Sequence, residues 1–132
     1  MLLIDQQLLD KTSAKAMQNE RLRMNFNIHS DLTDPVNRML NALEPGTIIP
    51  IHRHLHPYKN ESFVVLRGEL NVLIYDDNKN LLECINLNPL KGNYGIDIPG
   101  EVWHSIEVKE KNTVIYDVKE GPYVPIAEED ML

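Results

Sequence analysis

A single cysteine and the absence of any long apolar run restrict what this chain of 132 residues can be. One cysteine, Cys84, excludes an intrachain disulfide, and its position in an apolar run favours burial over a reactive thiol. No run of about 18 apolar residues is present, so a transmembrane helix is not expected. The apolar start of the chain meets Asp5 before it could form a signal-peptide core. These absences predict a cytoplasmic protein that does not contact a membrane.

Basic residues are also scarce, because 13 lysines and arginines face 20 aspartates and glutamates, for a formal net charge of −7. No stripe of basic residues with interleaved aromatics appears, so the attraction to a phosphate backbone is missing. We therefore expect no nucleic-acid partner. Part of the negative charge lies in the acidic tail 124–132, which we expect to be solvated rather than functional.

Helical periodicity is confined to residues 1–20, where Asp5 can cap a short helix that carries Leu8 and Leu9. The chain length fits one domain, with a helical lead-in at 1–20, a β-barrel or sandwich at 21–123 and the tail at 124–132. Between residues 36 and 118, short apolar runs are separated by turn residues. They predict an all-β fold with strands at 36–43, 47–51, 62–67, 69–75, 81–87, 94–98, 103–108 and 113–118.

The segment 21–29 alternates apolar and polar residues strictly, which predicts a strand with two unlike faces. Its polar face either contacts solvent or lines the mouth of the barrel, where guanidinium and amide groups suit phosphate, carboxylate or sugar hydroxyls. In the second interpretation, His29 transfers a proton. The substrate would then be bound by Arg21, Arg23, Asn25, Asn27 and Arg53.

Three of the five histidines, His52, His54 and His56, lie at the end of a predicted strand. Residues two apart on a strand face the same side, so His52 and His54 can direct two imidazoles to one metal ion. Glu61 can add a carboxylate oxygen, and His104 follows a turn far along the chain. An alternative pairing uses His54 and His56 instead of His52 and His54.

The spacing of these residues resembles the two motifs of the cupin superfamily. Five residues separate Gly46 from His52 and six separate Glu61 from Gly68, as in the first motif. The six residues between His54 and Glu61 form a longer gap than the family usually has. The pairing of His54 with His56 would shorten this gap but would spoil the spacing from Gly46. The second motif is matched less closely, by Pro99 and His104 with Gly100 one place early.

The flanking sequence is similar to one subgroup, the WbuC-type cupin metalloproteins. The shared phrases are Arg21-x-Arg23-x-Asn25-x-Asn27-x-His29, Arg38-Met39-Leu40-Asn41-Ala42-Leu43-x-Pro45-Gly46-Thr47 and Val118-Lys119-Glu120-Gly121-Pro122-Tyr123. This resemblance implies a cupin jelly-roll barrel of about eight strands with a short N-terminal helix. It also implies one divalent transition-metal ion, Zn, Fe, Mn or Ni, held by His52, His54, Glu61 and His104.

The resemblance favours a metal-dependent isomerase or epimerase that acts on a sugar phosphate or nucleotide sugar in surface-polysaccharide biosynthesis. The alternative is a non-catalytic module whose metal ion and basic pocket bind a carbohydrate or small anion. An iron-dependent dioxygenase is compatible with the ligand count alone. Because long edge strands in such barrels commonly pair with a second chain, we also expect a homodimer.

Overall fold

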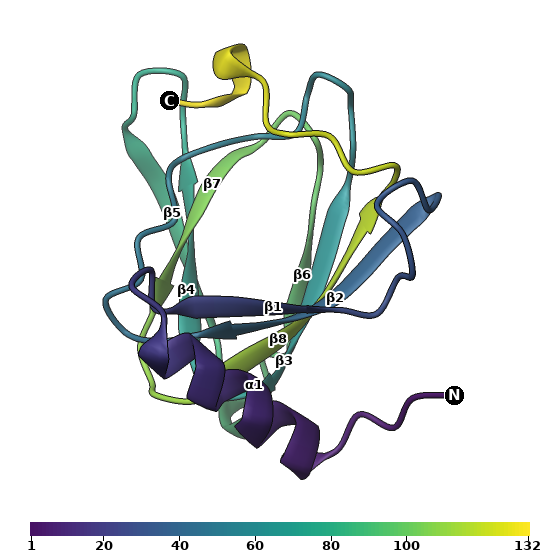
Figure 1. Ribbon diagram of the computed structural model, residues 1–132. Coiled ribbons are helices and arrows are strands. Elements are labelled where there is room, and N and C mark those ends of the chain that lie inside the picture. Colours follow the sequence, from purple (N-terminus) through teal and green to yellow (C-terminus); the bar gives the residue numbers. More distant parts are fainter.

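Eight antiparallel strands form two sheets that face each other in the computed structural model, which describes all 132 residues (Figure 1). The five-stranded sheet has the order β1-β2-β8-β3-β6 and the three-stranded sheet the order β5-β4-β7. The two sheets form a jelly roll that hydrogen bonds do not close into a barrel. The elements are α1 (Gln6–Gln18), β1 (Arg23–Asn27), β2 (Val36–Leu43), β3 (Glu61–Arg67), β4 (Leu70–Tyr75), β5 (Leu81–Leu87), β6 (Gly95–Ile98), β7 (Trp103–Val108) and β8 (Thr113–Glu120), with 3₁₀ turns η1 (Pro89–Lys91) and η2 (Glu128–Asp130).

The core lies between the two sheets, where side chains from both inner faces meet. Strand β3 shows the alternation that produces it, since Phe63 and Val65 are buried while Ser62 and Val64 are exposed. From the opposite sheet, Leu70 and its neighbours on β4 pack against them. Burial of large apolar side chains on both faces stabilises the sandwich. The predicted all-β architecture is confirmed.

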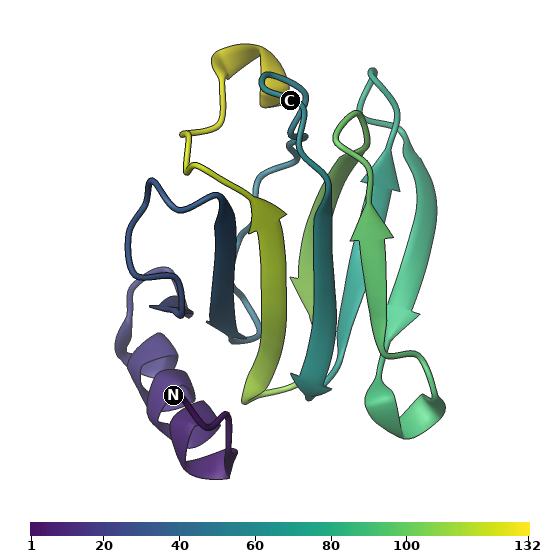
Figure 2. The same cartoon turned by 90° about the vertical axis from the view of Figure 1, so that its right-hand side faces the viewer.

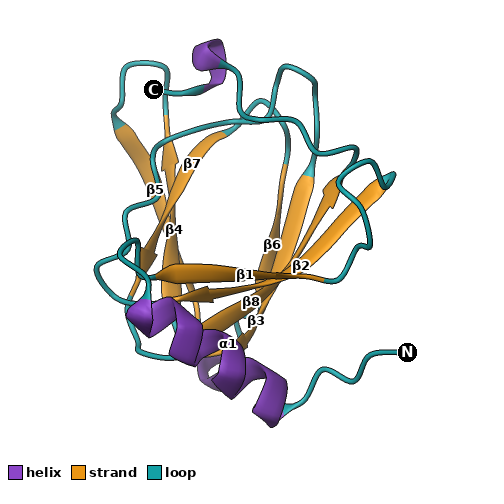
Figure 3. Ribbon diagram, viewed as in Figure 1, coloured by secondary structure: helices purple, strands orange, loops and turns teal.

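Helix α1 covers the outer face of the five-stranded sheet (Figure 3). As predicted, Asp5 caps it, and its carboxylate accepts a hydrogen bond of 2.9 Å from the amide of Leu8. Leu9 and Ala16 of the helix are buried against the sheet. The apolar face of β1 therefore packs beneath the helix, and its polar face turns towards the space between the sheets. The residues packed with the helix are Met24, Phe26, Ile28, Leu40, Ala42, Val114 and Tyr116.

Among the predictions made for the strands, two are wrong. The segment 47–51 is not a strand, because Pro50 has no amide to donate and no neighbouring strand runs along the segment. Its backbone bonds are isolated ones, such as the bond from the amide of Leu132 to the carbonyl of Ile51. Cys84 is exposed rather than buried, since it lies on the edge strand β5, most of which faces solvent. No helix is long and apolar enough to cross a membrane.

The C-terminal segment is not a free solvated tail. It crosses the end of the sandwich opposite α1, and the turn η2 lies above this end in both views (Figure 2). Asp130 is only 1% exposed, and the amide of Leu132 donates to the carbonyl of Ile51 at 3.0 Å. The expectation of a solvated tail is thus wrong at Asp130.

Candidate metal centre

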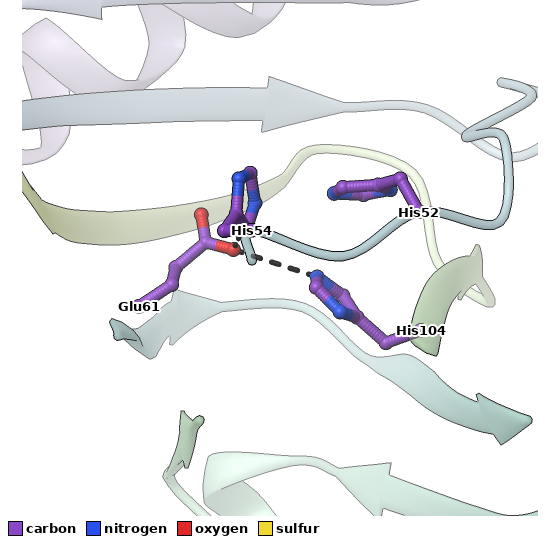
Figure 4. Close-up of side chains that lie close together, drawn as sticks. All are labelled: His52, His54, Glu61 and His104. Carbon is purple, nitrogen blue, oxygen red and sulfur yellow. Dashed lines mark ion pairs between the residues drawn. The ribbon is translucent and has the colours of Figure 1, made fainter. Parts of the chain in front are cut away.

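Four potential metal ligands meet at the end of the sandwich that the C-terminal segment crosses. His52 and His54 lie on the loop that precedes β3, Glu61 is the first residue of β3, and His104 is the second residue of β7. One ligand atom from each of the four lies within 4.8 Å of the others (Figure 4). Three imidazoles and one carboxylate at this separation suit a divalent transition metal.

Backbone bonds place these side chains. His52 and His104 exchange amide-to-carbonyl hydrogen bonds of 3.1 and 2.9 Å, so the two motif segments are joined directly. The amide of His54 donates to the carbonyl of Gly100 at 2.9 Å. A Cβ on Gly100 would lie 2.7 Å from the carbonyl oxygen of His54, so only glycine permits this approach. The turn before His104 and the loop of His54 therefore fix each other.

The histidine rings are oriented for coordination through Nε2. The Nδ1 atom of His52 lies 2.8 Å from the carbonyl oxygen of Pro50, and that of His104 lies 3.0 Å from the carbonyl oxygen of Val102. Since a carbonyl can only accept, Nδ1 carries the proton in each ring and Nε2 has a free lone pair. The Nε2 atom of His54 is buried without a hydrogen-bond partner. An unpartnered buried nitrogen in this position fits a metal ligand.

Glu61 lies between the rings, with Oε1 at 3.5 Å from Nε2 of both His54 and His104. Burial acts to raise the pKa of Glu61, but its interactions with His104 and His54 outweigh burial and hold the pKa well below its usual range. A second carboxyl group, that of Asp117 on β8, is buried close by. Burial and then the charge of Glu61 raise the pKa of Asp117 well above its usual range. The site thus keeps one carboxylate ionised for coordination.

His52 is held in the neutral form that coordinates metals. Burial, followed by repulsion from His104, lowers the pKa of His52 to about 4. At neutral pH this imidazole therefore needs to lose no proton before it binds an ion.

We expect the metal-free protein to lose stability as the pH falls from about 6.5 towards 4, because His52 gains a proton more readily in the unfolded chain. The full shift corresponds to about 3 kcal/mol, and partial exposure of the ring lowers the expected effect to about 2 kcal/mol. Urea unfolding with a chelator at several pH values would measure it. His52→Gln should remove this part of the pH dependence, and parallel profiles for the two proteins would contradict the assignment.

A cavity of about 160 Å³ opens beside the four ligands and is lined in part by His52, Glu61 and His104. It adjoins a wider cavity of about 680 Å³, bordered on one side by Tyr123 and Ile126 of the C-terminal segment. Five residues line both parts: Arg23, Asn25, Asn41, His52 and Asp117. Of the five residues predicted on the polar face of 21–29, two, Arg23 and Asn25, therefore lie beside the cluster.

The other residues predicted on the polar face of 21–29 do not lie beside the cluster. Arg21 lines only the wider cavity, and neither Asn27 nor His29 lines either part. Instead, Nδ1 of His29 lies 2.9 Å from the carbonyl oxygen of Arg38, beyond the end of β1. A proton-transfer role of His29 at this site is therefore not supported.

Arg53 and His56 lie outside the cavity. Alternation along the loop turns Arg53 away from His52 and His54, and its Nε donates to Asp130 at 2.9 Å. A substrate-binding role of Arg53 in this cavity is therefore not supported. His56 stands half exposed in the turn that takes up the long gap before Glu61, and the cluster contains His52 rather than His56.

Several cavity residues were missed at the sequence level. Asn37, Asn41, Asp117 and Lys119 all line the wider cavity, from the neighbouring strands β2 and β8. Asn37 is 1% exposed, and neither polar atom of its side chain has a hydrogen-bond partner. The available signal was polar residues at alternate positions of two strands, Asn37 and Asn41 in β2 and Asp117 and Lys119 in β8.

Comparisons with known proteins agree with this architecture. The model of a family described as "Domain of unknown function (DUF6016)" matches residues 4–87, more than half of the chain. That range contains three of the four clustered residues and ends before His104. No curated protein matches the sequence.

Solved structures with the same fold include KdgF from Halomonas sp., with a TM-score of 0.58, 14% identity and coverage of 74% of this chain and 77% of KdgF. The cupin domain of Cnp3 from Schizosaccharomyces pombe has a TM-score of 0.56, 13% identity and coverage of 74% of this chain and 64% of that structure. The capsular polysaccharide assembling protein CapF from Staphylococcus aureus has a TM-score of 0.60 and 20% identity over 83% of this chain. The chain spans 30% of CapF. At these identities the likeness establishes the cupin fold.

Proposed function

We propose a function for this chain on the basis of its four clustered potential ligands. The chain belongs to the family described as "Domain of unknown function (DUF6016)". The chain is a cupin-fold metalloprotein that binds one Zn, Fe, Mn or Ni ion through His52, His54, Glu61 and His104. The buried, unpartnered Nε2 of His54, aimed at the other three ligands, is the observation that carries this proposal. When bound, the ion supplies a Lewis acid for a carbonyl or hydroxyl oxygen.

The charges around the cavity favour an anionic sugar as the substrate. Arg21, Arg23 and Lys119 line the wider part, where a phosphate or carboxylate would pair with them. The side-chain amide of Asn37 and the oxygen of the Asn41 amide offer hydrogen-bonding groups for sugar hydroxyls in the same cavity. This polarity supports binding of a sugar phosphate or nucleotide sugar with its hydroxylated part towards the metal ligands.

An isomerase or epimerase also needs a group that moves a proton. Asp117 is the candidate by position, since it lines both parts of the cavity and its Oδ1 has no hydrogen-bond partner. Its Oδ2 accepts from the amide of Asn41 at 3.0 Å, which orients the carboxyl group. We therefore propose Asp117 for this role in place of His29. The description of CapF as a capsular polysaccharide assembling protein supports surface-polysaccharide synthesis as the context. The phrases shared with WbuC-type proteins support the same context.

Chelation tests the proposed activity. Turnover of sugar phosphates or nucleotide sugars should stop when a chelator is added and return with one particular metal ion. Tight ligand binding without turnover would instead favour the non-catalytic module. Absence of both metal uptake and ligand binding would contradict the proposal.

Arg23→Ala should weaken binding of the anionic sugar at least tenfold, or about 1.4 kcal/mol, because a guanidinium beside the cavity is lost. Calorimetry with the ligand found by a thermal-shift screen of such sugars measures the change. Metal content should not change. The matched control is Arg38→Ala, which removes an exposed arginine that lines neither part of the cavity. Equal affinities of Arg23→Ala and wild type would exclude anion binding by Arg23.

The edge strand β5 supports the proposed homodimer. It has one paired side, and Leu81 and Leu82 are 55% and 64% exposed there. Sedimentation of the protein as a monomer at micromolar concentration would exclude this dimer.

A further inference from the structure

Arg53 and Trp103 are sequence neighbours of the histidine ligands, and they contact each other on the side that faces away from the cavity. Arg53 lies between His52 and His54, and Trp103 precedes His104. The guanidinium carbon of Arg53 stands 4.3 Å from the centre of the Trp103 ring, within the range of a cation–π interaction. The two segments that supply the histidine ligands are therefore joined a second time, behind the ligands.

Asp130 connects this contact to the histidine loop. Its Oδ1 accepts from Nε of Arg53 at 2.9 Å and lies 3.0 Å from Nδ1 of His56. Its Oδ2 accepts from the amides of Leu55 at 3.2 Å and His56 at 2.8 Å. The carbonyl of Asp130 accepts from the amide of Arg53 at 3.0 Å. One buried carboxylate, 1% exposed, thus holds three residues on the two sides of His54: Arg53, Leu55 and His56.

We propose that Asp130 is a positioning residue for the metal centre and forms an outer clasp with Arg53 and Trp103. The clasp fixes the loop of His52 and His54 against the strand of His104, so that the three rings meet without rearrangement. This inference rests on the proposed metal site. It gives the C-terminal segment a role in metal affinity, although none of its residues is a ligand.

The bonding pattern explains why the clasp should affect binding. Without these bonds the loop would be held at His52 and His54 only by their backbone bonds to His104 and Gly100. It would then sample positions in which its two imidazoles diverge, and ordering it would oppose metal binding. Groups that orient metal ligands from outside the coordination shell typically change metal affinity by about 10- to 100-fold. Asp130→Ala removes every hydrogen bond between the Asp130 side chain and the loop, and leaves the contact of Arg53 with Trp103. Asp130→Asn can keep the bonds from the amides of Leu55 and His56 but loses the charged bond to Arg53.

The test is the dissociation constant for Co²⁺, measured by competition with a chelator, together with the visible absorption of the bound ion. Asp130→Ala should bind Co²⁺ at least tenfold more weakly than wild type, with an altered spectrum, and Asp130→Asn should lie between them. Glu129→Gln is the matched control, since it removes the negative charge of the neighbouring acidic residue, which is 65% exposed, and keeps the size of its side chain. Wild-type affinity and spectrum in Asp130→Ala would overturn the inference.

Two further measurements separate the possible failures. If Asp130→Ala does not fold, Arg53→Ala tests the same clasp and should weaken Co²⁺ binding severalfold. Amide hydrogen exchange of residues 52–56 reports on the loop without metal. It should accelerate at least tenfold in Asp130→Ala but not in Glu129→Gln. Unchanged exchange of these amides in Asp130→Ala contradicts the clasp. If wild type binds no Co²⁺ while exchange responds as expected, the proposed function fails instead.

Discussion

The triple substitution of His52, His54 and His104 by alanine should abolish metal binding. The remaining Glu61 supplies one carboxylate, which cannot hold a transition-metal ion in competition with water. We expect about one ion per chain in the reconstituted wild type and affinity lower by on the order of a thousandfold or more in the variant. Elemental analysis after reconstitution and removal of free metal measures the difference. Equal metal content in both proteins would show that the cluster is not a metal site.

Single substitutions decide between the two possible histidine pairs. His52→Ala should lose metal, because the Nε2 atom of His52 belongs to the cluster. His56→Ala should keep most of it, since the ring of His56 is half exposed and its nearest partners are Glu129 and Asp130. The reverse result would favour the pairing of His54 with His56.

The substitution Gly68→Ala should destabilise the fold by at least about 3 kcal/mol. Gly68 has a φ of +93°, and a Cβ there would lie 2.2 Å from Oγ1 and 2.7 Å from Cα of Thr113. Thr113 is fully buried and cannot move aside. Backbone strain and overlap thus add together. Urea unfolding of the metal-free protein measures the loss.

Gly92 provides the matched control, because its φ is also positive, at +84°, but a Cβ there would meet nothing within 4 Å. Gly92→Ala should therefore cost only the backbone term, about 1 kcal/mol. Similar losses in the two variants would show that the contact with Thr113 is not responsible. The comparison also explains why the first cupin motif ends in a glycine, Gly68. The backbone of Thr113 lies too close to this position for a Cβ atom.

The sequence was informative wherever local pattern determines structure. The predicted strands 36–43, 81–87 and 103–108 have the same bounds in β2, β5 and β7, because a short apolar run with turn residues at its ends is a local signal. The spacing of the histidines predicted a group that the fold brings together, although His54 and His104 are far apart in the chain. The spacing of the motif residues thus indicates which side chains meet in the fold, although the sequence shows no contact between them directly.

The remaining features depend on contacts that no local pattern encodes. The composition of the acidic tail predicts a solvated segment, but Asp130 is buried. Its charged partner is Arg53, which is 77 positions away in the sequence. The alternation of 21–29 is continuous, but β1 ends at Asn27 and only part of its polar face reaches the cavity. Asp117 is one carboxylate among many in the sequence, and only the pairing of β8 with β3 places it beside Glu61.

The order of strands in the larger sheet has a consequence for how the protein is made. Strand β8 lies between β2 and β3, and β3 has no other partner except β6. During translation, Glu61 and the histidines of its loop therefore emerge well before the strands that hold β3 in place. Such non-local pairing delays assembly until the late strands are available. We expect the ribosome-bound chain to expose His52 and His54 unorganised until β8 has emerged, so the proposed metal ion would bind only after that point.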